Sequence, residues 1–491
     1  MKKVLIMITA FVIAFGIRAS AEELCENGNL FDYTVVETAQ DEMELFGLSS
    51  SEKQARDEIV RGMQTYMEEI NISFARVSKD RIGYIVSAAY MEHPELYYVH
   101  DGYQYWYTTT STPYITKVKF TYMYPQSQLK ELNKVIENEK EHVLSMIDSS
   151  MTDLEKIMLI HNYVVTNHTY DYSYSIYNIY DFFTKRTGVC QAYALAMTYL
   201  LRAADVECSY ARSGDMNHVW NMVKIDSSWY HVDATWDDPN DDVGYCSYRY
   251  FLKSDSKFES DLGHYGWDSE YNATSAWFDN YYFTDYTSPF LYQGGEWYVQ
   301  KNGKLYKINH LKYGGSEVVF APDAQRYSGW YPQYDMSFAP YAGSFIYNVQ
   351  NEIYVVNLND YAKPRKIATV EDESYEVYSL SVNEHTLYYQ TGYYAADEMQ
   401  SLQLDSLVSL SYFKINNVYA DEEWVHLDYT YDNRYDKNWC IYVAAYDKDN
   451  TLIAIKAVDR GKYTIAMPKA DRYEAFIWEG CAPLCDSVNT K

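Results

Sequence analysis

Three short segments within residues 188–236 decide the fold: Gly188-Val189-Cys190-Gln191-Ala192-Tyr193-Ala194, Asn217-His218-Val219-Trp220-Asn221 and Trp229-Tyr230-His231-Val232-Asp233-Ala234-Thr235-Trp236. The first opens a run rich in Ala and Leu, which favours a helix from residue 190 onward. The other two predict strands over 218–225 and 229–235, separated by the turn Asp226-Ser227-Ser228. The segments therefore place a thiol, an imidazole and a carboxylate on a predicted helix and a predicted hairpin.

Cys190 lies in the first turn of the predicted helix. The partial positive charge of a helix N-terminus favours thiolate over thiol, and the thiolate is the reactive nucleophile. Backbone N–H groups of the same turn could also stabilise an oxyanion. Taken alone, however, the position fits a small core residue that opens an Ala-rich helix better than it fits a nucleophile.

The strand pair changes that balance. With Asp226 and Ser227 at the turn centre, the register that best separates polar from apolar faces puts Asp233 opposite Trp220 and diagonal to His218. That diagonal is about 7 Å between backbones, which side chains can bridge. A His held by an Asp is what a cysteine nucleophile needs, because the His takes the thiol proton and the Asp fixes the imidazole tautomer. We therefore predict Cys190, His218 and Asp233 as the catalytic residues.

Several alternatives stay open. His231 lies on the same predicted face as His218 and could replace it as the base, and Asp237 or Asp238 could replace Asp233. The acidic run of Asp237, Asp238, Asp241 and Asp242 offers oxygen ligands for calcium, but a solvated acidic loop is favoured, so we predict no metal and no cofactor. His161 and His168 are assigned to helix packing and a loop. The 56 tyrosines could line a carbohydrate or peptide groove, although half-buried strand surface is the simpler interpretation.

In their order and spacing, the three quoted segments resemble the bacterial transglutaminase-like superfamily. The resemblance covers residues 152 to about 240 and includes Ile160-His161-Asn162-Tyr163 and Tyr170-Asp171 before the cysteine. It implies a papain-like α+β core with Cys190 as nucleophile, His218 as base and Asp233 as the residue that orients it. Because the family includes cross-linking enzymes, peptidases and other amide-cleaving enzymes, the resemblance leaves the reaction open.

We predict an α+β chain of six stretches: a signal peptide at 1–21, an acidic N-terminal arm at 22–50, an N-terminal α+β region at 51–150, the transglutaminase-like catalytic domain at 151–260, a β-repeat region at 281–406 and a C-terminal β-sandwich module at 408–491. Apolar spacing predicts helices over 51–70 and 126–147, with strands within 97–124 between them. The capping box that Thr152 forms with Glu155 predicts the start of a further helix.

An internal repeat follows the predicted catalytic domain. Three similar segments begin 48 residues apart: Leu305-Tyr306-Lys307-Ile308, Ile353-Tyr354-Val355-Val356 and Ser401-Leu402-Gln403-Leu404. Paired short strands at this period are typical of propeller-like blades, but three units are too few to close an ordinary propeller, so we predict a partial array. Five later β-runs predict the sandwich, around Trp424, Cys440, Leu452, Tyr463 and Tyr473.

The N-terminal residues and the composition limit the compartment and the classes of partner that we expect for this protein. Lys2 and Lys3, the apolar run 4–17 and Ala19-Ser20-Ala21 predict a secretory signal peptide, hence a secreted or cell-surface protein without stable membrane insertion after cleavage. The formal net charge of −28 argues against a nucleic-acid backbone or an anionic membrane as the main partner. Seven cysteines are few and odd in number, so no disulfide scaffold is expected, although Cys481 and Cys485 could pair.

The sequence thus predicts a secreted cysteine enzyme that acts through a thioester on amide or peptide bonds. Extracellular proteins or cell-wall peptides are the expected substrates, and hydrolysis is slightly favoured over cross-linking because no feature identifies an amine site. The alternative is an inactive extracellular binding protein that uses its β-modules. The presence of Cys190, His218 and Asp233 together argues against that alternative.

Overall fold

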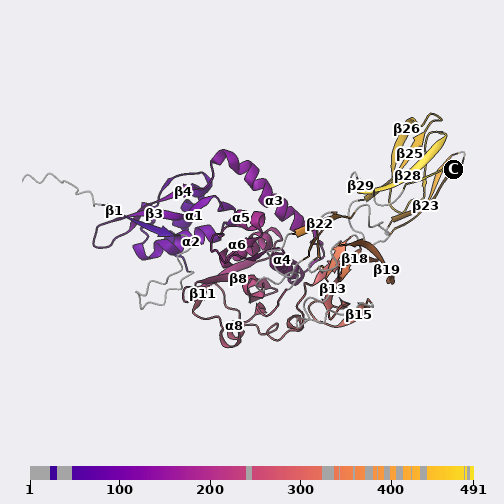
Figure 1. The fold of residues 1–491 in the computed structure, drawn as a ribbon. Helices are drawn as coiled ribbons and strands as arrows, with labels where there is room; N and C mark the ends of the chain where they lie inside the picture. Colours follow the sequence, from indigo (N-terminus) through magenta and orange to yellow (C-terminus); the bar gives the residue numbers. More distant parts are fainter. Residues whose placement is uncertain are drawn as a thin grey trace, which may run out of the picture. The chain divides into compact units, whose positions relative to one another are not determined.

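The protein is described by a computed structural model, which shows an α+β fold (Figure 1). The described residues are 23–29, 47–238, 246–322, 337–341, 343–357, 360–370, 377, 380–383, 385–391, 399–404, 413–421, 423–431, 439–479, 482–483 and 487–490. The predicted signal peptide and the pair Cys481 and Cys485 lie outside them. Across the described ranges, no helix combines the length and the apolar character needed to cross a membrane. The chain divides into two compact units, Met1–Leu129 and Lys130–Lys491.

The first unit is an antiparallel sheet with two main helices. Its strand order is β1-β3-β4-β2. The strands are β1 (Glu23–Asn29), β2 (Glu69–Asn71), β3 (Val99–Thr108) and β4 (Ile115–Tyr122), the helices are α1 (Ser50–Gln64) and α2 (Ile82–Met91), and the 3₁₀ turns are η1 (Ser73–Ala75), η2 (Lys79–Arg81), η3 (Pro94–Leu96) and η4 (Gln126–Gln128). The helix predicted over 51–70 ends early, because the chain turns at Tyr66, where φ is 59°. Ile70 then belongs to β2.

The second unit contains six helices in its described residues, and one of them, α6, begins with the predicted nucleophile Cys190. They are α3 (Leu129–Ser145, which begins at the last residue of the first unit), α4 (Asp153–Asn167), α5 (Ile179–Lys185), α6 (Cys190–Ala203), α7 (Ala234–Asp237) and α8 (Asp255–Asp261). Thr152 and Glu155 form the predicted capping box at the start of α4. A short parallel pair, β5 (Thr169–Tyr170) and β6 (Thr187–Gly188), brings the end of α4 beside the start of α6.

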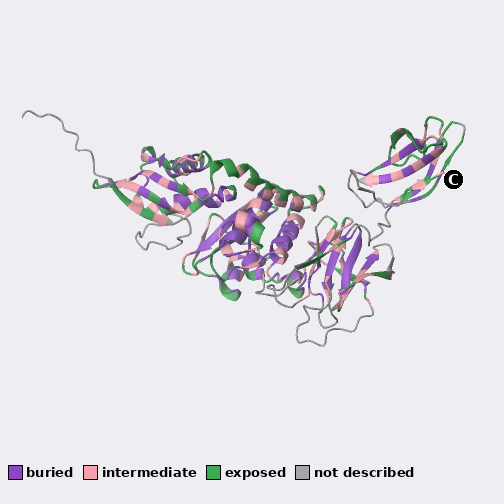
Figure 2. Ribbon diagram, turned by 45° about the horizontal axis from the view of Figure 1, so that its top comes forward, coloured by how far each residue is buried: buried purple, intermediate pink, exposed green. Residues whose placement is uncertain are grey.

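A five-stranded antiparallel sheet packs against these helices, in the order β10-β9-β8-β7-β11. Its strands are β7 (Cys208–Ser213), β8 (His218–Ile225), β9 (Ser228–Val232), β10 (Phe251–Lys253) and β11 (Trp267–Ser269). The predicted hairpin register is confirmed, since Asn221 pairs with Val232 and Met222 with His231. In Figure 2 the buried colour dominates β8 and α6.

The two faces of β8 meet different elements. Asn221 points to α6, where its buried Nδ2 donates to Ala194 O and to Thr198 Oγ1, each at 3.0 Å. The opposite face carries Trp220 and Met222 into a cluster with Phe258 of α8. The sheet is therefore covered on both sides, which fixes α6 relative to the start of β8.

In its described residues, the β-repeat region forms three separate antiparallel sheets. After the turn η5 (Tyr282–Asp285), the first sheet contains β12 (Leu291–Gln293), β13 (Glu296–Lys301), β14 (Lys304–Ile308) and β15 (Ser316–Phe320). The second contains β16 (Phe338–Tyr341), β17 (Ser344–Val349), β18 (Glu352–Asn357) and β19 (Asp360–Thr369). The third contains β20 (Leu380–Asn383), β21 (Thr386–Gln390) and β22 (Met399–Gln403). Each copy of the 48-residue repeat contributes one central hairpin, β13–β14, β17–β18 and β21–β22 in turn.

The C-terminal segment forms two sheets with a shared apolar core. One sheet has the order β23-β24-β27 and the other β26-β25-β28-β29, with β30 also paired to β28. Their strands are β23 (Phe413–Ala420), β24 (Val425–Tyr431), β25 (Trp439–Tyr446), β26 (Leu452–Val458), β27 (Thr464–Ile465), β28 (Arg472–Glu479), β29 (Ala482–Pro483) and β30 (Val488–Asn489). Side chains of both sheets, among them Leu427 and Ile441, form one buried cluster.

Candidate active site

Cys190 is the first residue of α6 and is partly exposed. The preceding residue, Val189, caps the helix with an extended backbone, and its N–H donates to Ile176 O at 3.0 Å. The N–H groups of a first helical turn have no partner within the helix. The thiol therefore lies where free backbone donors and the positive end of the helix dipole meet.

His218 and Asp233 meet as the hairpin register predicts. His218 opens β8 and is 5% exposed, and its Nε2 lies 2.6 Å from Oδ2 of the fully buried Asp233. Asp233 follows β9 directly and is also the N-cap of α7, because its Oδ1 accepts from the backbone N–H of Thr235 and of Trp236 at 3.1 and 3.2 Å. One carboxylate thus caps a helix and holds the imidazole.

The thiol of Cys190 lies near enough to His218 to act on the pKa of the imidazole. Because Nε2 faces Asp233, Nδ1 is the ring nitrogen that remains for the thiol. Burial disfavours the cationic imidazole, but the charge and hydrogen bond of Asp233, together with Cys190, outweigh it and raise the pKa of His218 to about 10. Burial likewise opposes ionisation of Asp233, yet His218 lowers the pKa of this carboxyl below its usual range. These shifts favour an imidazolium at His218 beside the carboxylate of Asp233.

A residue that the sequence analysis missed joins this cluster. His264 is fully buried in the loop between α8 and β11, and its Nε2 lies 2.9 Å from the same Oδ2 of Asp233. Its only sequence signal is the histidine in Gly263-His264-Tyr265-Gly266, just after a short capped helix. That segment lies 46 residues beyond His218 and outside the three quoted motifs, so only the fold brings it to the site.

The structure decides against His231 as the base. This side chain is fully buried, its Nδ1 accepts from Trp220 Nε1 at 2.9 Å, and its Nε2 lies 2.8 Å from Asp255 Oδ1. Burial lowers the pKa of His231. With both ring nitrogens engaged, neither is available to Cys190.

Asp237 and Asp238 do not replace Asp233. Asp237 is fully buried, with Oδ2 3.2 Å from His161 Nε2 and Oδ1 accepting from the N–H of Tyr250. Asp238 accepts a short hydrogen bond from the hydroxyl of Tyr193. His161, assigned to packing from the sequence, is thus half of a second buried histidine–aspartate pair.

His168 fills the space beside α5. Its Nδ1 lies 3.0 Å from Val164 O, and its ring stacks on Phe182 with centroids 3.9 Å apart. Burial lowers its pKa well below the ordinary value, so the ring is neutral. The residue lies between the end of α4 and the start of β5, which agrees with the loop position assigned from the sequence.

The ligand-type atoms of His218, Asp233 and His264 lie within 4.8 Å of one another. A zinc ion bound at about 2.0–2.1 Å would hold its ligand atoms about 3.3 Å apart. The two nitrogen–oxygen distances at Asp233 are 2.6 and 2.9 Å, which are hydrogen-bond distances. We therefore assign the group to a hydrogen-bonded cluster. Asp241 and Asp242, considered for calcium, lie outside the described residues.

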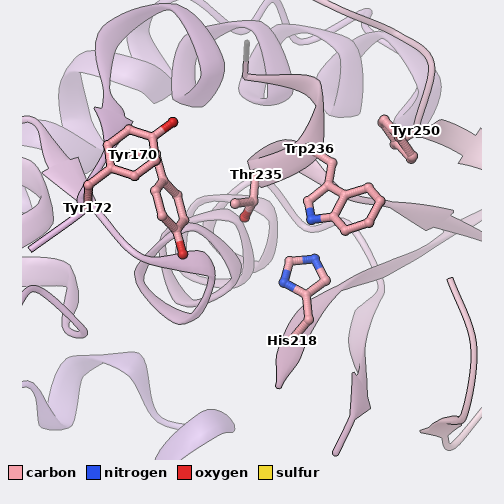
Figure 3. Close-up of a pocket in the computed structure, with 6 residues that line it drawn as sticks. All are labelled: Tyr170, Tyr172, His218, Thr235, Trp236 and Tyr250. Atoms are coloured by element: carbon pink, nitrogen blue, oxygen red, sulfur yellow. The ribbon is translucent and has the colours of Figure 1, made fainter. Parts of the chain in front are cut away.

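A cleft of about 330 Å³ opens onto this cluster. Its lining residues are Tyr170, Tyr172, His218, Thr235, Trp236 and Tyr250. Figure 3 shows His218 between the two aromatic sides, with Tyr170 and Tyr172 on one and Trp236 and Tyr250 on the other. Tyr172 is 52% exposed and Trp236 39%, so both rings can contact a bound molecule.

The tyrosine side of the cleft is built around one carboxylate. Asp171, 7% exposed, accepts hydrogen bonds from the N–H and hydroxyl groups of Ser173 and Ser175 and from the N–H of Ile176. Burial opposes its ionisation, but these donors hold its pKa at about 2. Its own N–H donates to Gly188 O, which ties the loop to the segment that precedes the thiol.

Residues 141–234 match the family model of the transglutaminase-like superfamily. The chain contains a transglutaminase-like domain. The matched range includes Cys190 and His218 and ends one residue after Asp233, so His264 lies beyond it. No curated protein matches the chain.

Solved structures with similarity to this chain include a TGase, at 12% identity over 26% of this chain and 42% of the other, with a TM-score of 0.19. A candidate protease from Parabacteroides distasonis ATCC 8503 has 14% identity over 25% and 28%, with a TM-score of 0.17. The extracellular domain of a one-component system from B. thetaiotaomicron has 11% identity over 55% and 42%, with a TM-score of 0.19. This chain spans less than half the length of each.

Two thiols besides Cys190 lie in the described part of residues 151–260. Cys208 and Cys246 are both free. Burial raises the pKa of Cys208 to about 11 and that of Cys246 well above the ordinary value. Since thiols held protonated are poor nucleophiles, these two provide internal controls for any test of Cys190.

Proposed function

We propose that this protein is a cysteine-dependent acyl-transfer enzyme, with Cys190 as nucleophile, His218 as general base and acid, and Asp233 as the residue that orients His218. The observation that carries the proposal is the 2.6 Å contact between His218 Nε2 and Asp233 Oδ2, with Cys190 near enough to the same imidazole to raise its pKa. The match of residues 141–234 to the transglutaminase-like superfamily supports it.

The cycle begins with the proton of Cys190 on His218. The thiolate attacks the carbonyl carbon of an amide, forming a carbon–sulfur bond, and the oxyanion is stabilised by backbone N–H groups at the start of α6. His218 then gives its proton to the leaving nitrogen as the carbon–nitrogen bond breaks. A thioester on Cys190 and a free amine result.

Water or a second amine completes the cycle. His218 takes a proton from the incoming group, which attacks the thioester carbon and displaces the sulfur of Cys190. The proton on His218 and the thiolate restore the starting ion pair. Attack by water gives a carboxylic acid, and attack by an amine gives a new amide. We propose hydrolysis as the main outcome, because water needs no binding site of its own.

The cleft suggests an uncharged acyl donor. Among the described residues that line the cleft, His218 is the only ionisable group other than tyrosine hydroxyls, and exposed aromatic rings stand on both sides. Such walls suit uncharged or aromatic segments of a peptide. Together with the predicted signal peptide, this favours extracellular proteins or cell-wall peptides as substrates of a secreted or cell-surface enzyme. The cycle uses no metal or cofactor.

Alkylation with iodoacetamide tests the proposal. The rate at each thiol is followed by peptide mapping between pH 5 and 9, with the exposed Cys440 as an internal reference. Cys190 is expected to react faster than Cys440 at pH 6, and His218→Ala is expected to abolish this difference. His231→Ala is the matched control, because His231 is equally buried but does not contact the thiol.

Two results would contradict the proposal. Alkylation of Cys190 no faster than that of Cys440 across the pH range would favour an inactive binding protein. An unchanged Cys190 profile in His218→Ala would mean that the imidazole does not activate the thiol. Adding a primary amine to active enzyme and peptide then separates hydrolysis from cross-linking by the mass of the product.

A further inference from the structure

Asp233 accepts hydrogen bonds from four donors, and only one of them is the proposed base. Thr235 N and Trp236 N serve Oδ1, while His218 Nε2 and His264 Nε2 share Oδ2. An ionised carboxylate offers about four lone-pair sites, and all of them are used here. The proposed cycle needs only the bond to His218, so the buried imidazole of His264 requires a separate explanation.

The fold holds His264 in place by its backbone. The flanking Gly263 and Gly266 take φ angles of 77° and 60°, which residues with a Cβ rarely adopt. The His264 N–H donates to Phe258 O at 3.1 Å. The carbonyl of Tyr265 accepts from Ser213 Oγ at 2.8 Å.

This anchoring links His264 to the proposed base. Ser213, which holds the loop, is also the β-sheet partner of His218 in the pairing of β7 with β8. The loop with the second histidine and the strand end with the first therefore share one residue. Both imidazoles reach Asp233 from elements fixed to each other.

The hydrogen bonds also define which nitrogen of His264 carries the proton. An ionised carboxylate oxygen only accepts, so Nε2 of His264 must be the donor. Its Nδ1 is buried and has no hydrogen-bond partner among the described residues. A second proton there would be a buried unsatisfied donor, which is costly. His264 is therefore a neutral imidazole with its proton on Nε2.

We infer that His264 is a positioning residue for the proposed reaction, donating from Nε2 to Asp233 so that this carboxylate stays ionised and aligned on His218. A neutral donor fits this role, because it fills the remaining acceptor site without cancelling the charge that His218 needs. The inference rests on the proposed function. It adds a fourth side chain, one that the motif positions do not contain.

The surroundings keep water from taking the place of His264. The ring of Trp236 lies 4.3 Å from that of His264 and 5.6 Å from that of His218, and Figure 3 shows it beside His218 at the cleft. Phe258 packs on the other side, with ring centroids 4.3 Å apart. Asp233 and His264 are both fully buried. Loss of the His264 donor would therefore leave Oδ2 of Asp233 with one hydrogen bond fewer and no water to replace it.

The other titratable groups that face the cluster come from four elements. They are Cys190 of α6, His231 of β9, Asp237 of α7 and Tyr250 before β10. None of the last three donates to Asp233. Replacing His264 should therefore act on Cys190 through Asp233 and His218.

The test compares three variants by alkylation of Cys190 with iodoacetamide between pH 5 and 9. His264→Leu removes the donor, whereas His264→Gln can place an amide N–H near the same oxygen. Phe258→Leu is the control, because it loosens the packing around His264 without removing a hydrogen bond. We expect His264→Leu to slow the reaction at pH 6 about tenfold to a hundredfold, the range for a lost bond to an ion. Most of the rate should return in His264→Gln, and Phe258→Leu should match the wild type.

The outcomes separate the inference from the proposed function. Wild-type Cys190 that reacts like Cys440 overturns both. A fast wild-type reaction with an unchanged profile in His264→Leu overturns the inference alone, as does equal loss in His264→Leu and Phe258→Leu. If His264→Leu does not fold, ¹⁵N NMR of histidine-labelled wild type, assigned with His264→Gln, still decides. A neutral ring with its proton on Nε2 supports the inference, and a doubly protonated ring or a proton on Nδ1 overturns it.

Discussion

Replacing Asp233 with Asn tests the proposed triad most sharply. The change keeps the shape of the side chain but removes the negative charge beside His218. The pKa of His218 is about 10 against an ordinary 6.5, and without the carboxylate its burial would push the pKa below 6.5. At about 1.4 kcal/mol per pKa unit, the imidazolium loses at least about 5 kcal/mol. Breaking a buried charge pair costs about 3–5 kcal/mol by mutation, which agrees.

That loss sets the size of the expected effect. Each 1.36 kcal/mol is a factor of ten in rate, so turnover should fall roughly 10²- to 10⁴-fold. Alkylation of Cys190 at pH 6 should fall at least about 100-fold and recover only toward pH 9, as for an ordinary thiol. Asp255→Asn is the matched control, since Asp255 holds the other buried imidazole of the sheet, His231. A Cys190 profile that is unchanged in Asp233→Asn, or equally changed in Asp255→Asn, would refute the reasoning.

Three further predictions concern stability. Burial lowers the pKa of Lys253 to about 8, so the unfolded state binds more protons between pH 8 and 10.5 and the free energy of unfolding rises with pH in that range. In urea unfolding, Lys253→Met should remove up to about 3 kcal/mol of that rise. An equal rise in the wild type and the variant would contradict this prediction. The pKa of Asp171 is about 2, so the stability that its carboxylate contributes is present above pH 4 and is lost as the pH falls toward 2. Asp171→Asn should therefore cost about 2 kcal/mol at pH 7, measured as a lower Tm. A difference in Tm between the wild type and the variant that persists at pH 2 would argue against this prediction. His161→Leu should cost about 3 kcal/mol in urea unfolding, because the buried Oδ2 of Asp237 loses its partner. The double variant with Asp237→Leu should recover part of this loss, and a double variant less stable than His161→Leu would disprove the pairing argument.

Local patterns predicted the part of the site that lies on regular elements. The hairpin register followed from the period of two along each strand, since only one pairing parity puts Val219 and Val223 on the same face as Val232 of the partner strand. The start of α4 followed from the capping box of Thr152 with Glu155. These features depend on residues that are close together in the sequence or that face each other across one turn. Such residues can be identified from a single sequence.

Other features depend on contacts between distant segments. His264 reaches Asp233 only because β11 joins the far edge of the sheet beside β7, and no local pattern encodes that strand order. The end of α1 was misplaced for a similar reason. Ile70 continues the apolar spacing of the helix but belongs to β2, where its side chain packs against Gly62 so closely that no Cβ would fit there.

Position 233 shows why a local interpretation can be incomplete. The sequence predicts Asp233 only as the residue that orients His218, yet the structure also gives it the cap of α7, with one carboxylate oxygen for each role. The capping bonds fix the carboxylate plane, and the other oxygen is left to meet the histidines. A single side chain with two acceptor atoms satisfies both roles.

The central claim is that Cys190 carries the acyl group. The most direct measurement incubates the purified protein with peptide and muropeptide libraries, quenches it in acid, and maps covalent adducts by mass spectrometry. We predict an acyl adduct on Cys190 that hydroxylamine removes, together with released amine products, and neither in Cys190→Ala. Products that form at the wild-type rate in Cys190→Ala, or an acyl adduct on another residue, would contradict the account.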